Sequence, residues 1–460
     1  MLPHLCMVRL RQKPGEAVAR PGSISYCPRR RRARADWQRR AGGGKQAMSE
    51  TSPAGRQETA VVALVSSAHC FSHYYIFALP TILAFMVKDP ALAHLELNFV
   101  KAGLVVSAFS LASGGFQFLM GVLADRIGAK RVLFTGLALL AVSFGLMSFA
   151  GSYWMILVLA FCAGAGNSVF HPVDYSIMSA NVRGPKLARA YATHTFSGYA
   201  GFAIGPFVSA TLASAYGWHV AFAAAGIAGV AMTGLLWSQR HRMAAEPRHK
   251  HSSAQAARAP LGFGIVLAPP ILMMFVFYTL TGGLAIGLNS AVAASLNKLW
   301  TIPLDDAARA VSAFMVGAAL GTIVGGIVAT RIKRLDLASF IGYGASGLMM
   351  CLIASIHMPY AVVLAVFCVA GFSSGLITPS RDLMVKSLTP PGHSGKVFGF
   401  VSSGFEIGGI ALAPAFGWLI DHNAPSWVFY AAAAIMGMTF LAAVAAMRVR
   451  RPVLQPVAAE

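Results

Sequence analysis

Apolar stretches of roughly 20 residues recur along the chain, and a helix of that length crosses a hydrocarbon core about 30 Å thick. Only 12% of the 460 residues are charged and 56% are apolar, whereas a soluble domain carries about 25% charged residues. We therefore expect an all-α membrane protein with twelve transmembrane helices. The pattern predicts spans near residues 59–87, 98–122, 132–150, 153–179, 189–214, 218–238, 264–295, 307–330, 337–356, 360–386, 396–420 and 426–447.

The longest polar stretch inside this apolar region divides the predicted helices into two groups of six. We expect a six-helix half at 59–238, a cytoplasmic linker at 239–261, a second six-helix half at 262–447 and a cytoplasmic tail at 448–460. The halves also repeat, since a shift of 207 residues places Gly164 on Gly371 and Pro172 on Pro379. Parallel six-helix repeats of this kind are typical of transporters, with the substrate site near the midplane between the halves.

The net charge of +21 is distributed unevenly, because twelve of the 37 Lys and Arg residues lie in the first 47 positions. We expect residues 1–58 to be a basic, disordered tail, since the segment is rich in Gly, Pro and Arg. Met48 opens a short polar segment that leads directly into the first span. Our hypothesis is that the native chain starts at Met48, the alternative being a genuine basic arm. Intact mass of a native protein that begins at Met1 would refute it.

The remaining basic residues gather in alternate loops. Lys and Arg in short loops mark the cytoplasmic side of a membrane protein. One set of loops includes the linker and Arg126, Lys130 and Arg131, whereas the opposite set carries acids such as Asp89 and Asp421. We therefore expect a multi-pass protein of the cell (inner) membrane with both termini in the cytoplasm. Topology explains the charge, so we expect no nucleic-acid partner.

The loop after the second predicted span reads Gly121-Val-Leu-Ala-Asp125-Arg126-Ile-Gly128-Ala-Lys130-Arg131. It resembles the signature of the major facilitator superfamily, Gly-x-Leu-Ala-Asp-Arg-x-Gly-x-Lys-Arg, in the loop where that family carries it. The resemblance implies the major facilitator fold of two pseudo-symmetric six-helix halves. It also implies that this loop latches the halves in the outward-facing state. Ala129 stands where the family usually has Arg, so the latch would run through Lys130 or Arg131.

Two further segments are similar to a branch of that family. The fourth span contains Phe170-His171-Pro172, which resembles the fosmidomycin-resistance-like drug exporters. The fifth contains Gly201-Phe-Ala-Ile-Gly205-Pro206, which matches the core of the antiporter signature Gly-x-x-x-Gly-Pro but lacks its trailing glycines. This likeness implies gating roles for Gly201, Gly205 and Pro206.

Ionisable side chains inside a span cost about 2.5 kcal/mol or more at the membrane centre, so each is a candidate for substrate or proton handling. Glu406 lies about ten residues into the eleventh span, hence about 15 Å deep. Carboxyls in apolar surroundings exchange protons nearer neutral pH than carboxyls in water. We expect Glu406 to couple transport to protons, the alternative being a protonated packing residue.

His69 and His73 lie four residues apart in the first span and therefore share one helix face. An imidazole titrates near neutrality and can donate to an anionic substrate, so at least one of them is expected to line the cavity. The alternative is a hydrogen-bonded packing face. His171, His194 and Asn289 are further candidates for the cavity.

Charged residues also lie near the cytoplasmic ends of the fourth and tenth spans. Asp174 falls on Arg381 under the repeat, and Asp382 follows. We expect these residues to form gate pairs at the inner mouth rather than to contact substrate.

The chain contains no Gly-x-x-x-x-Gly-Lys-Ser/Thr segment, which argues against ATP-driven pumping. We expect no cofactor and no metal, since His249 and His251 in the linker are too weak a pattern. The predicted function is proton-coupled efflux of a small drug-like molecule by a monomer in a lipid bilayer. The alternatives are uptake of an organic anion or other metabolite with protons and, from another class, a membrane sensor or enzyme.

Overall fold

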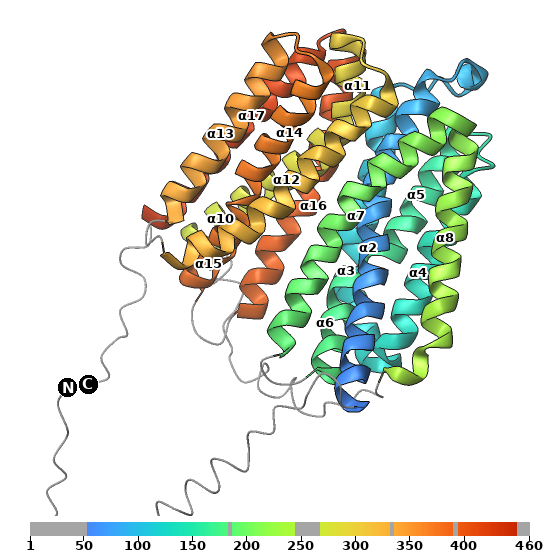
Figure 1. Ribbon diagram of the computed structural model, residues 1–460, viewed down its shortest axis with the longest axis vertical. Coiled ribbons are helices and arrows are strands. Elements are labelled where there is room, and N and C mark those ends of the chain that lie inside the picture. Colours follow the sequence, from blue (N-terminus) through green and yellow to red (C-terminus); the bar gives the residue numbers. More distant parts are fainter. Residues whose placement is uncertain (1–52, 183–185, 244–266, 332–334, 390–393, 449–460) are drawn as a thin grey trace, which may run out of the picture. The chain divides into compact units, whose positions relative to one another are not determined.

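The computed structural model describes residues 53–182, 186–243, 267–331, 335–389 and 394–448 (Figure 1). Expectations for most of the basic tail, most of the linker and nearly all of the C-terminal tail therefore lie outside the described residues. Within those ranges the regular elements are all helices, as the hydrophobic pattern predicted. The described residues contain eleven helical spans that are long and apolar enough to cross a membrane, some of which join two or three consecutive helices, and Ser339–Ser355 is a shorter apolar helical segment.

The N-terminal half consists of α2 (Pro53–Lys88), α3 (Phe99–Ile127), α4 (Ala129–Met147), α5 (Tyr153–Asn167), α6 (Phe170–Asn181), α7 (Lys186–Tyr216) and α8 (Trp218–Ser238). The short helices η1 (Pro90–Leu95) and η2 (Arg240–Arg242) follow α2 and α8. The C-terminal half consists of α10 (Pro269–Gly282), the π-helical turn η4 (Gly283–Leu288), α11 (Asn289–Trp300), α12 (Leu304–Arg331), α13 (Leu335–Ser355), α14 (Tyr360–Gly375), α15 (Thr378–Leu388), α16 (Ser394–Asp421) and α17 (Pro425–Arg448).

Two predicted spans are broken, and the breaks occupy equivalent places in the two halves. The span at 153–179 becomes α5 and α6, and the span at 360–386 becomes α14 and α15. Pro172 and Pro379 lie in the first turn of the second pieces. A proline has no N–H to donate four residues back, and its ring crowds that carbonyl. The two prolines are 207 positions apart, so the breaks follow the internal repeat.

Among the described residues, two helix pairs make the most extensive contacts between the halves: α3 packs against α16, and α7 against α12. Small residues allow the first pair to approach closely, since a Cβ at Gly103 would lie 2.6 Å from the Pro414 backbone. The Ser107 hydroxyl donates to the Ile410 carbonyl at 2.8 Å. We call the end of the bundle that holds Phe99 the far end, and the end that holds the turn between α3 and α4 the basic end.

The far end of this interface is closed by a carboxylate. Asp421, the last residue of α16, accepts hydrogen bonds from the backbone N–H groups of Phe99 at 3.0 Å and Val100 at 2.8 Å. These are the first residues of α3, whose N–H groups have no partner within the helix. Asp421 therefore caps α3 across the boundary between the halves.

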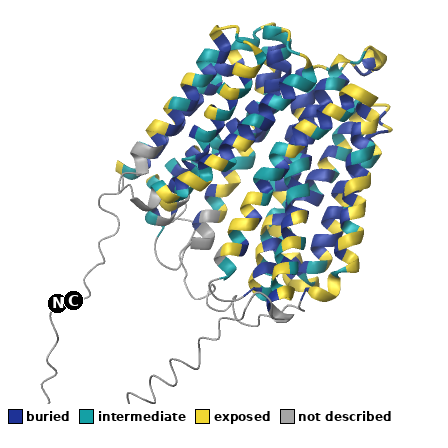
Figure 2. Cartoon of the chain, viewed as in Figure 1, coloured by how far each residue is buried: buried dark blue, intermediate teal, exposed yellow. Residues whose placement is uncertain are grey.

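Buried residues run along the helices of both halves and form two hydrophobic clusters (Figure 2). Phe144 and Phe222 belong to the core of the N-terminal half, and Phe367 and Phe429 to that of the C-terminal half. Toward the basic end α3 has exposed apolar positions, among them Phe118 at 78%. The described contacts of α3 with α16 thus lie at the far end and in the middle of the bundle.

Candidate functional site

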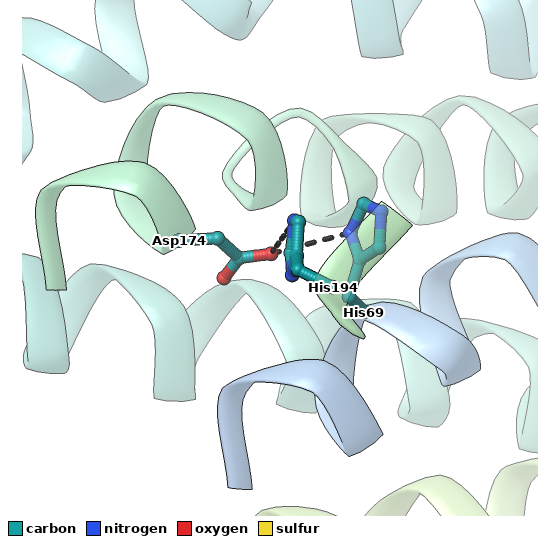
Figure 3. A group of neighbouring side chains, drawn as sticks. All are labelled: His69, Asp174 and His194. Carbon is teal, nitrogen blue, oxygen red and sulfur yellow. Dashed lines mark ion pairs between the residues drawn. The ribbon is translucent and has the colours of Figure 1, made fainter. Parts of the chain in front are cut away.

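A buried carboxylate and two imidazoles meet inside the N-terminal half (Figure 3). Nδ1 of His69 on α2 lies 3.2 Å from Oδ2 of Asp174 on α6, and Nε2 of His194 on α7 lies 3.6 Å from the same oxygen. The rings of His69 and His194 stack with their centroids 3.8 Å apart. Asp174 is 0% exposed and both histidines are buried. We call these three residues the His–Asp cluster.

Glycines on α7 bring the cluster together. A Cβ at Gly201 would overlap the carbonyl oxygen of Cys70, and one at Gly205 would lie 2.7 Å from that of Tyr74. A Cβ at Gly198 would meet the His73 ring at 2.9 Å. Any larger side chain at these positions would therefore push α7 away from the histidine face of α2. Gly201 and Gly205 thus set the distance between two helices, and the gating role that the sequence suggested for them stays a prediction.

The remaining candidate histidines surround the cluster. The His73 ring centroid lies 4.3 Å from that of His69, and the His171 centroid lies 5.4 Å from it. His171 is exposed, whereas His73 is half-buried and packs against Phe202. The break before α6 places His171 and Asp174 one turn apart on the same short helix. Four histidines from three helices thus gather around Asp174. From the sequence, the histidines were expected in the cavity and Asp174 at the gate.

Glu406 lies elsewhere, at the interface between the halves. It is half-buried on α16 and faces α3, where a Cβ at Gly114 would lie 2.8 Å from its side chain. The Ser110 hydroxyl is its hydrogen-bonding partner. The predicted depth is consistent with this position near the middle of α16.

The residue equivalent to Glu406 under the 207-residue repeat is Tyr199 on α7, and it lies at the second interface. The hydroxyl of Tyr199 is 3.2 Å from that of Thr322 on α12 and 3.5 Å from that of Thr378 on α15. A polar residue therefore occupies the same place in each of the two interfaces. Sequence reasoning missed Tyr199, although the repeat that places it opposite Glu406 was visible.

A buried polar bridge connects three helices of the N-terminal half and was also missed. The Ser72 hydroxyl on α2 donates to Oδ1 of Asn167 at 2.6 Å, and Nδ2 of Asn167 donates to the Ser113 hydroxyl on α3 at 3.0 Å. An asparagine within an apolar helix was the available signal, since such a group needs partners in a membrane.

Arg381 on α15 lies with its guanidinium carbon 4.8 Å from the ring centre of Tyr278 on α10. The Tyr343 and Thr281 hydroxyls are 3.2 Å apart in the same half. Asp174 instead contacts the histidines, and the side chain of Asp382 is outside the described residues. The gate pairs therefore stay a prediction.

The loop between α3 and α4 has the backbone that its glycine predicts. Gly128 has φ +97°, a conformation that favours glycine, and it ends α3 and begins α4. Nζ of Lys130 donates to the Met243 carbonyl beyond α8 at 3.0 Å. Arg131 donates to the carbonyl of Ile127 within the loop at 3.5 Å. These contacts do not reach the C-terminal half, and the latch remains a prediction.

The remaining candidate residues lie outside the His–Asp cluster. Nδ2 of Asn289 donates to the Ala285 carbonyl at 2.7 Å and so supports the π-helical turn that precedes it. A Cβ at Gly121 would be in ordinary contact with Pro172, at 3.5 Å. Asp125 and Arg126 are exposed, and Pro206 is buried within α7.

The family model of the Major Facilitator Superfamily matches residues 64–295 and 275–460. A fosmidomycin resistance protein of Escherichia coli is 26% identical over 347 residues, which cover 73% of this chain and 82% of that protein. The multidrug resistance protein MdtH of Yersinia enterocolitica is 25% identical over 378 residues, covering 78% and 89%.

The fold is also that of solved transporters. The nucleoside transporter NupG superposes with a TM-score of 0.69 at 14% identity, over 85% of this chain and 99% of its own. A bacterial homologue of the human lysosomal transporter Spinster gives 0.67 at 13% identity, over 88% and 100%. The twelve-helix fold predicted from the sequence is confirmed.

Proposed function

Because the chain belongs to the Major Facilitator Superfamily, whose members are transporters and not enzymes, we propose that it exports a small drug-like molecule by proton-coupled alternating access. The names of the two relatives, which concern resistance to fosmidomycin and to multiple drugs, support export. The distribution of basic residues supports an inner-membrane protein with the basic end, both termini and the linker in the cytoplasm.

The position of Glu406 is the observation that carries proton coupling. A coupling group must gain its proton on one side of the membrane and lose it on the other, so it must lie where access alternates. Glu406 lies in the interface between α16 and α3, beside the Ser110 hydroxyl. Movement of one half against the other would change its surroundings at each transition. We assign the coupling proton to this carboxyl.

Glu406→Gln tests the assignment, because glutamine resembles the protonated carboxyl but cannot release a proton. In everted vesicles we expect the variant to lose pH-gradient-driven accumulation of a fluorescent drug while it still exchanges substrate down the substrate's own gradient. Glu96→Gln is the matched control, since Glu96 is an exposed acid outside the membrane helices whose partner is Lys101 at 3.7 Å. Gradient-driven transport by Glu406→Gln with a wild-type pH profile would place the proton elsewhere.

A second candidate is uptake of an organic anion with protons, and Arg381 favours it. The guanidinium next to Tyr278 offers a positive charge with an aromatic neighbour, which suits a carboxylate or phosphonate group. The direction of proton flux on addition of substrate to vesicles distinguishes the two. Proton-coupled export moves protons and substrate across the membrane in opposite directions, whereas symport moves both in the same direction.

A further inference from the structure

We propose that His69, Asp174 and His194 form a binding site for one divalent transition-metal ion of the Zn²⁺ class within the N-terminal half. The inference goes beyond drug or anion transport and is independent of Glu406. It rests on the spacing of the three donor atoms, on their burial without hydrogen-bond partners, and on the chemistry of the donor set. The ion would join α2, α6 and α7 at one point.

The spacing fits a metal ion. Zn²⁺ binds imidazole nitrogen and carboxylate oxygen at about 2.0–2.2 Å, so two ligand atoms in a tetrahedral site lie about 3.4 Å apart. The two distances from Oδ2 of Asp174, 3.2 Å to His69 and 3.6 Å to His194, lie on either side of that value. The three donor atoms are all within 4.8 Å of one another. The third distance, between the two imidazole nitrogens, would adjust to the same length when the ion binds.

Hydrogen bonds do not account for these atoms. Both carboxylate oxygens of Asp174, both ring nitrogens of His194 and Nδ1 of His69 are buried and lack a hydrogen-bond partner. Polar groups buried in this way normally find hydrogen-bond partners, and burying a carboxylate without them is particularly costly. A divalent cation would satisfy the carboxylate and both imidazoles at once.

The donor set selects the class of ion. Two imidazoles and one carboxylate suit Zn²⁺ and neighbouring first-row ions, whereas Mg²⁺ and Ca²⁺ prefer oxygen ligands. Three protein ligands leave a fourth position open. His171, exposed and with its ring centroid 5.4 Å from that of His69, is the neighbouring side chain from which a fourth nitrogen would come if α6 moved on binding.

The internal repeat does not reproduce the three ligands in the C-terminal half. Under the 207-residue repeat His69 corresponds to Val276, His194 to Val401 and Asp174 to Arg381. Two apolar side chains and a cation cannot bind a metal ion. The chain should therefore bind one ion. The three ligands are specific to the N-terminal half and are not required by the fold that the two halves share.

Cobalt tests the proposal, because Co²⁺ bound by nitrogen and oxygen in tetrahedral geometry absorbs strongly in visible light. The full-length chain would be purified in detergent, freed of its affinity tag and of metal, and titrated with Co²⁺ and then Zn²⁺. We expect one Co²⁺ per chain and loss of the absorption when Zn²⁺ displaces it. Wild-type protein that shows no such absorption would overturn the proposal.

Variants locate the ion. His69→Gln, His194→Gln and Asp174→Asn should each weaken Co²⁺ binding at least about tenfold. His219→Gln is the matched control, since that histidine contacts the Ser148 carbonyl at 2.7 Å, away from the cluster. It should bind as wild type does.

Further controls separate other sources of binding. Replacing His249 and His251 together should leave the absorption unchanged, whereas its loss would place the ion in the linker. Binding retained by both His69→Gln and His194→Gln, each eluting as a monodisperse peak, would also refute the site, even if Asp174→Asn failed to fold. Glu406→Gln should bind Co²⁺ normally, so the metal site and the proton assignment fail separately.

Discussion

Asp421→Ala should open the far end of the transporter. The substitution removes two hydrogen bonds that cross between the halves, from the N–H groups of Phe99 and Val100 at 3.0 and 2.8 Å. Hydrogen bonds to a charged group contribute about 1.5–3 kcal/mol each when buried. Asp421 is half-buried and the freed N–H groups can bind water, so we expect a net loss of about 2 kcal/mol. That free energy corresponds to about a 30-fold change in the ratio of closed to open forms.

The assay is a distance measurement between spin labels at the far end. Gly151 and Ile356 are exposed there, one in each half, and can be replaced by cysteine in a background without native cysteines. Double electron–electron resonance should show a larger population of long distances in the Asp421→Ala protein.

Asp89→Ala is the matched control at the same end. Asp89 also accepts two hydrogen bonds, from the Ala91 N–H and from Nε1 of Trp218, both at 2.9 Å. Both donors belong to the N-terminal half, so this variant should lose stability without a change in the distance distribution. Equal opening in the two variants, or none with Asp421→Ala, would refute a cap that acts between the halves.

Three other substitutions have defined outcomes. Gly201→Ala should destabilise the protein by about 1–3 kcal/mol and lower its melting temperature, because the added Cβ overlaps the Cys70 carbonyl. Gly115→Ala is the control, since it has open space around it and should not lower the melting temperature. Gly128→Ala should cost about 1–3 kcal/mol in thermal unfolding, because φ +97° strains any side chain. Asp125→Asn should lower transport with normal membrane insertion, and wild-type rates in a correctly inserted variant would contradict the predicted latch.

The sequence determined the elements and their order. Runs of apolar residues long enough to cross a bilayer can form only helices there, because every backbone N–H and C=O must be satisfied within the segment. Three other features were also visible in the sequence: the six-plus-six division, the loop signature and the repeat that aligns Pro172 with Pro379. Each depends on neighbouring residues or on a fixed sequence offset. The predicted spans did not contain the breaks before α6 and α15, although these breaks coincide with prolines that the sequence shows.

Only the tertiary structure decided which polar residues meet. Asp174 was predicted near a cytoplasmic gate, yet it lies against His69 and His194, which come from two other helices. Glu406 was predicted near the midplane of the eleventh span, but that its neighbour Ser110 belongs to the other half was not visible in the sequence. The helical period fixes the side of its own helix on which a residue lies. Which neighbouring helix packs against that side depends on how closely the two backbones approach. Between α2 and α7, the glycines of α7 set the distance between the backbones.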